Sequence, residues 1–166
     1  MRALRFRQVH LDFHTSEAIP SIGEKFDKRQ FQEALKRGHV DSITLFSKCH
    51  HGLSYHATKV GQRHPNLQTE LLPRQMEACR ELDIKCPVYI SAGLDEWRAR
   101  DTPAWIALKQ DGRGVWPLEA RYRPLGFDTP YLDYLCEQIE EAVENFGCVD
   151  GIFLDIIALR DSIGQT

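Results

Sequence analysis

The sequence lacks the features that mark several classes of protein. No apolar run approaches the roughly 20 residues needed to cross a bilayer, so no membrane partner is expected. The basic residues are scattered and the formal net charge is -3, so nucleic acid is not expected as a partner either. Residues 1–7 carry positive charge without the apolar segment of a secretory signal. We therefore expect a cytoplasmic protein.

Cysteine is present, but without the spacing of a disulfide framework or a metal site. There is no Cys-x-x-Cys pair, and four of the five cysteines lie in apolar segments, where a free cysteine behaves as a small hydrophobic residue. The five cysteines of the chain are Cys49, Cys79, Cys86, Cys136 and Cys148. We expect free thiols in a reducing compartment, and no cofactor.

Strands and helices are expected to alternate along the chain. Low-complexity segments and linkers are missing, so residues 1–166 are predicted to form a single domain. Apolar and β-branched runs predict strands at residues 8–13, 40–46, 85–91 and 149–157. Helical spacing and caps predict helices between Asp27 and Gly38, over residues 71–82, and between Thr129 and Gly147.

This alternation predicts an α/β fold, the N-terminal half of a (β/α)₈ barrel, with about four parallel strands and intervening helices. The long connections follow the second and third strands, so the elaborated loops lie at the carboxyl ends, where barrels place active sites. An open doubly wound sheet would give a similar pattern, but its Gly-rich phosphate turn is absent. Four strands leave two edges unpaired, so we expect a homodimer or a missing C-terminal half as partner.

Three ionisable residues, His10, Asp12 and His14, alternate along the first predicted strand. Alternate residues share one face of a strand, so all three are expected to face the site and to bind substrate. Charged groups in such a position need a ligand, a metal or each other. In the alternative interpretation His14 already lies in the loop, and only one or two of these residues face the pocket.

Two further groups of residues follow the second and third strands. His50 and His51 are expected to bind substrate together only if the backbone turns, and Gly52 permits such a turn. The alternative is a solvated loop; His56 and His64 are expected at the surface. After the third strand, Tyr89, Asp95, Glu96 and Trp97 suit carbohydrate, although Asp95 and Glu96 would equally cap a helix. Trp105 and Trp116 are expected to be packing residues.

Asp155 ends the fourth predicted strand after an apolar run from Gly151 to Leu154. An acid at the carboxyl end of a barrel strand indicates a catalytic role. Alternatively, a neighbouring arginine or backbone amides neutralise it. Asp150 precedes the strand and is expected on the opposite, stabilising face.

At these places the sequence resembles a family of hypothetical glycoside-hydrolase-like (β/α)₈ barrels. The matching segments are residues 8–15, 40–52, 87–91 and 149–155. More distantly, it is similar to the family 29 α-L-fucosidases, which have a Lys-His-His-like motif after the second strand and a nucleophilic Asp ending the fourth. The resemblance implies that Asp155 is the nucleophile and that His50 and His51 bind substrate hydroxyls. Glu96 and Trp97 would then line the site, and His10 would lie at its base.

A retaining glycosidase also needs an acid/base, which such barrels take from a later strand, or here from Glu96 or Asp95 if their loop folds over Asp155. Two other hypotheses remain open. The pattern of His10, Asp12 and His14 also suits a divalent metal, as in amidohydrolase-like barrels, although further ligands with convincing spacing are lacking and no metal is predicted. The third hypothesis is a carbohydrate-binding fragment without catalysis.

Overall fold

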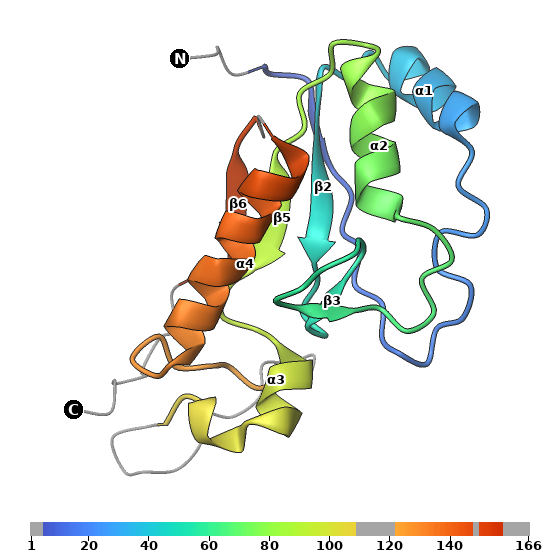
Figure 1. Cartoon of the computed structure of the whole chain (residues 1–166). Coiled ribbons are helices and arrows are strands. Elements are labelled where there is room, and N and C mark those ends of the chain that lie inside the picture. The colour runs from blue at the N-terminus through green and yellow to red at the C-terminus, as the bar shows by residue number, and fades with distance from the viewer. Residues whose placement is uncertain (1–4, 109–121, 148–149, 158–166) are drawn as a thin grey trace.

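The computed structural model describes residues 5–108, 122–147 and 150–157. Its main sheet contains four parallel strands, paired in chain order (Figure 1). They are β1 (Gln8–His10), β2 (Ser42–Lys48), β5 (Val88–Ser91) and β6 (Ile152–Asp155). This order, with helices between the strands, is that of the first half of a (β/α)₈ barrel, as predicted. Three of these strands, β1, β5 and β6, are shorter than expected, and β1 ends at His10 rather than at residue 13; β2 has the expected length but lies two residues further along the chain.

The loop after β2 contains a small unpredicted addition to the sheet. β3 (Leu53–Ser54) pairs antiparallel with Lys48 at the end of β2, and β4 (Gln62–Arg63) pairs with β3. Two-residue strands have no recognisable sequence period, so this segment is expected to look like a polar loop in the sequence. The addition covers the carboxyl end of β2 (Figure 1).

The helices are α1 (Lys28–Arg37), α2 (Leu71–Arg80), α3 (Glu96–Asp101), the short 3₁₀ helix η1 (Pro103–Trp105) and α4 (Tyr131–Phe146). The bounds of α1 are as predicted, whereas α2 ends at Arg80 rather than at residue 82, and the N-cap of α4 is Pro130 rather than Thr129. The Asp27 side chain accepts a hydrogen bond from the Gln30 amide at 2.7 Å, and Gly38 ends α1. At α4, Gly147 stops the helix with a positive φ of 68°, which glycine adopts without steric cost.

The two faces of the sheet have different roles. Ile43, Leu45, Val88 and Ile90 point to the outer face, where α1, α2 and α4 bury them in the largest apolar cluster. The helices contribute Leu35, Leu72, Met76, Cys79, Leu135 and Ala142. Free Cys79 and Cys86 are buried in this core, while free Cys136 is exposed; Cys148 lies outside the described residues. The core therefore lies under the helices, and the inner face is left for other groups.

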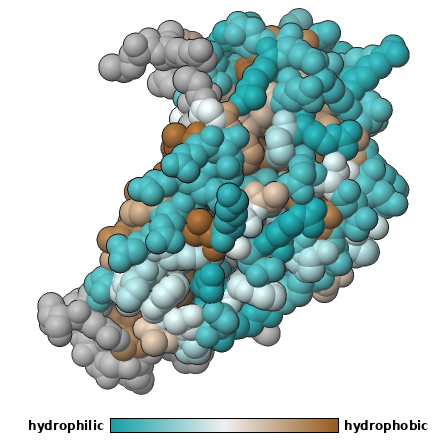
Figure 2. All heavy atoms as spheres, viewed as in Figure 1, coloured by the Kyte–Doolittle hydropathy of each residue, from teal (hydrophilic) through white to brown (hydrophobic). Residues whose placement is uncertain are grey.

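The inner face carries aromatic and polar residues. Phe46 and Tyr89 stack with ring centroids 3.9 Å apart, and Phe153 stacks on the other side of Tyr89 at 5.8 Å. Phe153 is 44% exposed because β6 is an edge strand in the described part of the chain. Apolar patches interrupt the mostly hydrophilic surface on the side where α4 and β6 lie (Figure 2). None of the described helices is long and apolar enough to span a membrane.

Candidate active site

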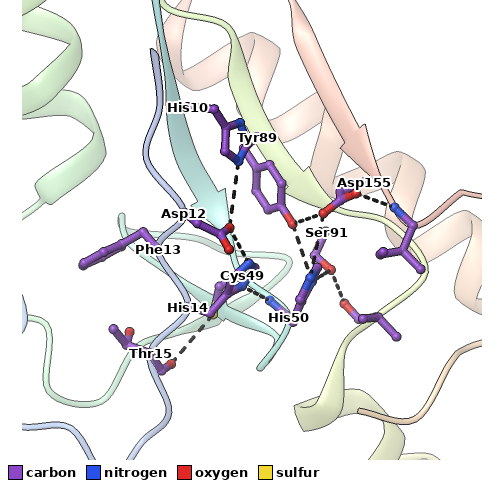
Figure 3. A network of polar contacts seen from close by, with 12 residues as sticks. His10, Asp12, Phe13, His14, Thr15, Cys49, His50, Tyr89, Ser91 and Asp155 are labelled. Carbon is purple, nitrogen blue, oxygen red and sulfur yellow. Dashed lines mark hydrogen bonds and ion pairs between the residues drawn. The ribbon is translucent and has the colours of Figure 1, made fainter. Parts of the chain in front are cut away.

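Polar side chains from all four parallel strands meet at the carboxyl end of the inner face (Figure 3). β1 and the segment after it supply His10, Asp12 and His14, and the turn after β2 supplies His50. β5 supplies Tyr89 and Ser91, and β6 supplies Asp155. The expectation that these strand ends converge is met, because parallel strands bring their carboxyl ends to one edge.

His10, Asp12 and His14 share one face, as the alternation predicts. The Nε2 of His14 lies 2.8 Å from Asp12 Oδ1, and the Nε2 of His10 lies 3.9 Å from the same oxygen. Leu11 and Phe13 point the other way and line an apolar cavity beside α1 and α2. Alternation therefore continues beyond the hydrogen-bonded part of β1, and His14 reaches the cluster although it lies outside the strand.

His14 and His50 form a stacked pair, with ring centroids 3.9 Å apart and an interplanar angle of 21°. The backbone N–H of His50 donates to His14 Nδ1 at 3.1 Å. The Nδ1 atom of the His50 ring lies 2.7 Å from the Ser91 hydroxyl oxygen. Both imidazoles are thus held in place by groups of this chain.

Three histidines of the site, His14, His50 and His51, are kept neutral by burial. Burial, followed by the neighbouring His14 ring, lowers the pKa of His50 to about 4. Burial also lowers the pKa of His14, against the opposing effect of Asp12, and it lowers the pKa of His51. Near pH 7 these rings therefore offer one donor and one acceptor each, which suits hydroxyl groups.

A tight turn and the first turn of α3 fix the two adjacent histidines. Gly52 has φ +80°, and its amide donates to the Cys49 carbonyl at 2.9 Å, so the turn expected at this glycine is present. The amides of Glu96 and Trp97, which start α3, donate to the carbonyls of His50 and His51 at 3.0 Å each. These amides have no partner within the helix, and here they anchor the histidine backbone.

Asp95 stabilises α3, the helix whose first amides bind the His50 and His51 carbonyls. Its side chain caps α3 by accepting from the Arg98 amide at 2.9 Å, which confirms the capping interpretation. Its other oxygen lies 3.1 Å from Lys48 Nζ, which also contacts the Tyr131 hydroxyl at 3.2 Å. Asp95 is fully buried and both its oxygens are engaged, so we leave it out of the proposed substrate site.

Asp155 is held at the open side of the cluster. The Tyr89 hydroxyl donates to its Oδ2 at 2.7 Å, and the Ile156 amide donates to its Oδ1 at 2.9 Å. Burial and this carboxylate raise the pKa of Tyr89, so the phenol stays protonated as a donor. His50 Nε2 lies 3.8 Å from Oδ2. No arginine pairs with Asp155 among the described residues, and its side chain is 35% exposed.

The backbone around Asp155 adopts an uncommon geometry. Ile156, which follows it, has φ 57°, a conformation that a β-branched residue rarely takes. A Cβ on Gly93 would lie 2.1 Å from the Ile156 carbonyl oxygen. Only glycine therefore permits the segments that follow β5 and β6 to approach each other this closely. Strain of this kind concentrates at functional sites.

Glu96, Trp97 and His51 lie beside the cluster. The Glu96 carboxylate pairs with the Arg123 guanidinium, at 2.5 Å in the closest contact, and it makes no described contact with Asp155. Trp97 packs partly buried against a small apolar cluster, and His51 Nε2 bonds the Tyr122 hydroxyl at 2.8 Å. No role was predicted for Ser91, Tyr122 or Lys48. The available signals were that Ser91 shares a strand face with Tyr89 and that Lys48 precedes His50 and His51 as in a Lys-His-His-like motif.

Two histidines expected at the surface are buried, and this prediction was wrong. His56 is 3% exposed and bonds the Ser47 hydroxyl at 2.8 Å; His64 is fully buried and bonds the Ser16 carbonyl. Both lie between β3 and the residue that follows β4, a segment for which the sequence predicts a polar loop. Trp105 packs against Tyr131 and Tyr134, as expected, while Trp116 lies outside the described residues.

Asp150 lies at the opposite end of β6, where a stabilising role was expected. It pairs with Lys85 at 3.2 Å and accepts from the Cys86 amide at 3.0 Å. Within the described ranges, no group of three His, Cys, Asp or Glu side chains is placed to hold a metal ion. The site presents the Asp155 carboxylate beside the neutral His50 ring and the Tyr89 hydroxyl, with Asp12 bonded to His14.

Solved structures with this fold include fucosidases. Alpha-L-fucosidase isoenzyme 2 from Paenibacillus thiaminolyticus is 45% identical with a TM-score of 0.89, over 96% of this chain and 24% of that chain. The Thermotoga maritima alpha-fucosidase in complex with fucose is 23% identical with a TM-score of 0.58, over 80% of this chain and 29% of that chain. At this identity, the similarity is evidence for a shared fold and for nothing more. This chain thus spans about a quarter of the Paenibacillus enzyme. No curated protein sequence matches it.

A family model also matches the chain, over residues 27–156. The match includes α1, β2, β5, α4 and β6, and therefore the elements that carry His50, Tyr89 and Asp155. The chain belongs to the family described as hypothetical glycosyl hydrolase 6.

Proposed function

We propose that this chain forms the nucleophile-bearing part of the sugar site of a retaining glycoside hydrolase, with an α-L-fucoside as substrate. The observation that carries the proposal is the placement of Asp155. It is an accessible carboxylate at the carboxyl end of β6, oriented by the Tyr89 hydroxyl and the Ile156 amide. The identity to the Paenibacillus alpha-L-fucosidase supports the choice of sugar.

In the proposed reaction, an Asp155 oxygen attacks the anomeric carbon and the bond to the leaving group breaks with its electron pair. The neutral ring of His50 forms a hydrogen bond with a sugar hydroxyl beside it, and the stacked His14, whose two ring nitrogens bond the His50 amide and Asp12, holds His50 in place. His10, Asp12 and His51 are proposed as further hydroxyl ligands, and Trp97 as a lining residue. Water then releases the sugar from Asp155.

The reaction also needs an acid/base that protonates the leaving oxygen. Glu96 was the predicted candidate within this chain, but to act it would have to leave Arg123. The chain spans 24% of the Paenibacillus fucosidase. The role therefore fits a carboxylate from a further part of the barrel better than it fits Glu96.

A fluorinated sugar tests the nucleophile independently of the acid/base. A fucosyl fluoride with a second fluorine at C2 transfers its sugar to a nucleophile and releases fluoride, which needs no protonation, while the product hydrolyses slowly. We expect intact-mass spectrometry to show one added fluorofucosyl group on the chain, and peptide mapping to locate it on Asp155. Asp155→Asn should remain unlabelled, and the exposed control Asp133→Asn should label like the wild type.

The outcomes separate the alternatives. Labelling of Asp155→Asn at the wild-type rate would reject Asp155 as the nucleophile. Fucose binding without any labelling, unchanged in Asp155→Asn, would support a carbohydrate-binding protein without catalysis. Loss of both binding and labelling in the folded wild-type chain would reject the proposed sugar site. A Glu96→Gln variant that labels normally but hydrolyses unactivated fucosides slowly would restore Glu96 as the acid/base.

A further inference from the structure

We propose that Ser91 is a positioning residue that fixes the tautomer of His50, so that His50 Nε2 accepts, rather than donates, a hydrogen bond at the sugar site. The inference deepens the proposed function and rests on it, because the tautomer matters for the reaction only if the site binds sugar. The tautomer itself can be measured without any ligand.

The Ser91 hydroxyl has one hydrogen, and the structure assigns its direction. Ser91 is fully buried at the end of β5, with its oxygen 2.7 Å from the Leu94 carbonyl oxygen. A carbonyl can only accept, so the Ser91 hydrogen points to Leu94. Toward His50 Nδ1, also 2.7 Å away, the hydroxyl oxygen can then only accept, and Nδ1 must carry a proton.

The state of the ring decides what remains for Nε2. His50 is neutral near pH 7, because burial and the His14 ring lower its pKa to about 4. A neutral imidazole has one N–H, so protonation of Nδ1 leaves a lone pair on Nε2. The Tyr89 hydroxyl, 3.5 Å from Nδ1, donates its own hydrogen to Asp155 and therefore does not compete.

His14 is fixed in the opposite tautomer. Its Nδ1 accepts from the His50 backbone N–H at 3.1 Å, so its proton lies on Nε2, which donates to Asp12 at 2.8 Å. The two stacked rings thus differ: His50 presents an acceptor, whereas the outward nitrogen of His14 is a donor already engaged by Asp12. Of the two rings, only His50 therefore has a free ring nitrogen, Nε2, that can accept a hydrogen bond from a substrate hydroxyl.

This arrangement has a consequence for the sugar. His50 Nε2 and Asp155 Oδ2 are 3.8 Å apart and are both acceptors, so they do not bond each other. A sugar hydroxyl beside them donates to Nε2, which leaves the Asp155 oxygen free to attack. If Ser91 is lost, Nε2 can take the proton instead and donate to Asp155, and the ring then competes for the nucleophile.

Nitrogen NMR tests the tautomer directly. In a two-bond ¹⁵N–¹H spectrum of histidine-labelled chain at pH 7, assigned with a His50→Gln variant, we expect a protonated Nδ1 and a bare Nε2 for His50. Ser91→Ala should shift His50 toward protonated Nε2 or a mixture. The matched control is Ser47→Ala, which removes another buried hydroxyl, 2.8 Å from His56 Nε2, and should leave His50 unchanged.

The same variants test the role in the reaction. Labelling by the difluorinated fucoside should slow about tenfold in Ser91→Ala, the effect of about one hydrogen bond, and not in Ser47→Ala. A protonated Nε2 in the wild type, or a tautomer unchanged by Ser91→Ala, overturns the proposal. A changed tautomer with an unchanged labelling rate also overturns it. If the wild type shows the expected tautomer but never labels, the proposed function fails while the tautomer assignment stands.

Discussion

Replacing Lys48 by methionine removes one partner of a fully buried ion pair. Lys48 is 1% exposed and Asp95 is fully buried, and their Nζ and Oδ2 atoms lie 3.1 Å apart. Methionine fills much of the same space but leaves the Asp95 carboxylate without a counter-charge. Removal of one partner of such a pair costs about 3–5 kcal/mol, because the remaining charge stays buried. We expect a loss of this size in the free energy of unfolding.

A double variant separates the charge from the packing. In Lys48→Met/Asp95→Asn the buried charge is gone, while the asparagine oxygen still accepts from the Arg98 amide and caps α3. We therefore expect the double variant to be more stable than Lys48→Met alone. Urea unfolding, followed by circular dichroism, measures both. As a control, Lys28→Met breaks the solvent-exposed Lys28–Glu81 pair and should cost far less stability than Lys48→Met, because solvent screens an exposed pair.

Two results would refute this reasoning. The first is a Lys48→Met chain that loses no more stability than Lys28→Met. The second is a double variant as unstable as Lys48→Met, since this would show that lost packing, not an unpaired charge, sets the cost. Because Asp95 caps the helix whose amides hold the His50 and His51 carbonyls, Lys48→Met should also shift the ring resonances of His50.

Three further predictions concern the turn, the pH response and the sheet edge. Gly52→Ala should lower the free energy of unfolding by more than about 1 kcal/mol, since φ is +80° and the new Cβ would lie 2.0 Å from Asp95 Oδ1; an unchanged urea midpoint would contradict this. The pKa of His50 is about 4 in the folded chain and 6.5 in the unfolded chain, so the unfolded chain takes up the proton first as the pH is lowered. The free energy of unfolding should therefore decrease between pH 6.5 and pH 4, and it should decrease less steeply in His50→Gln. In sedimentation at micromolar concentration the chain should self-associate, with Ile157→Lys shifted toward monomer, because Ile157 is 62% exposed beyond the edge strand β6; a wild-type monomer would contradict this.

The order of elements could be predicted from the sequence because each element carries local signals. Asp27, Gly38 and Gly147 mark helix ends through their own backbone preferences, and the apolar runs of β2 and β5 mark buried parallel strands. The shared face of His10, Asp12 and His14 also followed from local geometry, since alternation depends only on the extended backbone.

The support of the site could not be predicted, because it depends on contacts between distant segments. The ion pair joins residues 47 positions apart, and the Ser91–His50 bond joins residues 41 apart. Nothing near Asp95 in the sequence shows that Lys48 will reach it. The burial of His56 and His64 was missed because their partners lie in other segments: Ser47, which bonds His56, belongs to β2, and Ser16, which bonds His64, lies 48 positions away.

The hydrogen bonds that orient His14, His50 and Asp155 all come from residues between Asp12 and Ile156. The groups of the proposed sugar site therefore form a self-contained unit, a cassette, that gene fusion or exchange can join to various other segments without rebuilding it. Among proteins that share this half, we expect the recognised sugar to be inherited with the cassette. The preference for the leaving group should instead follow whichever segment supplies the proton.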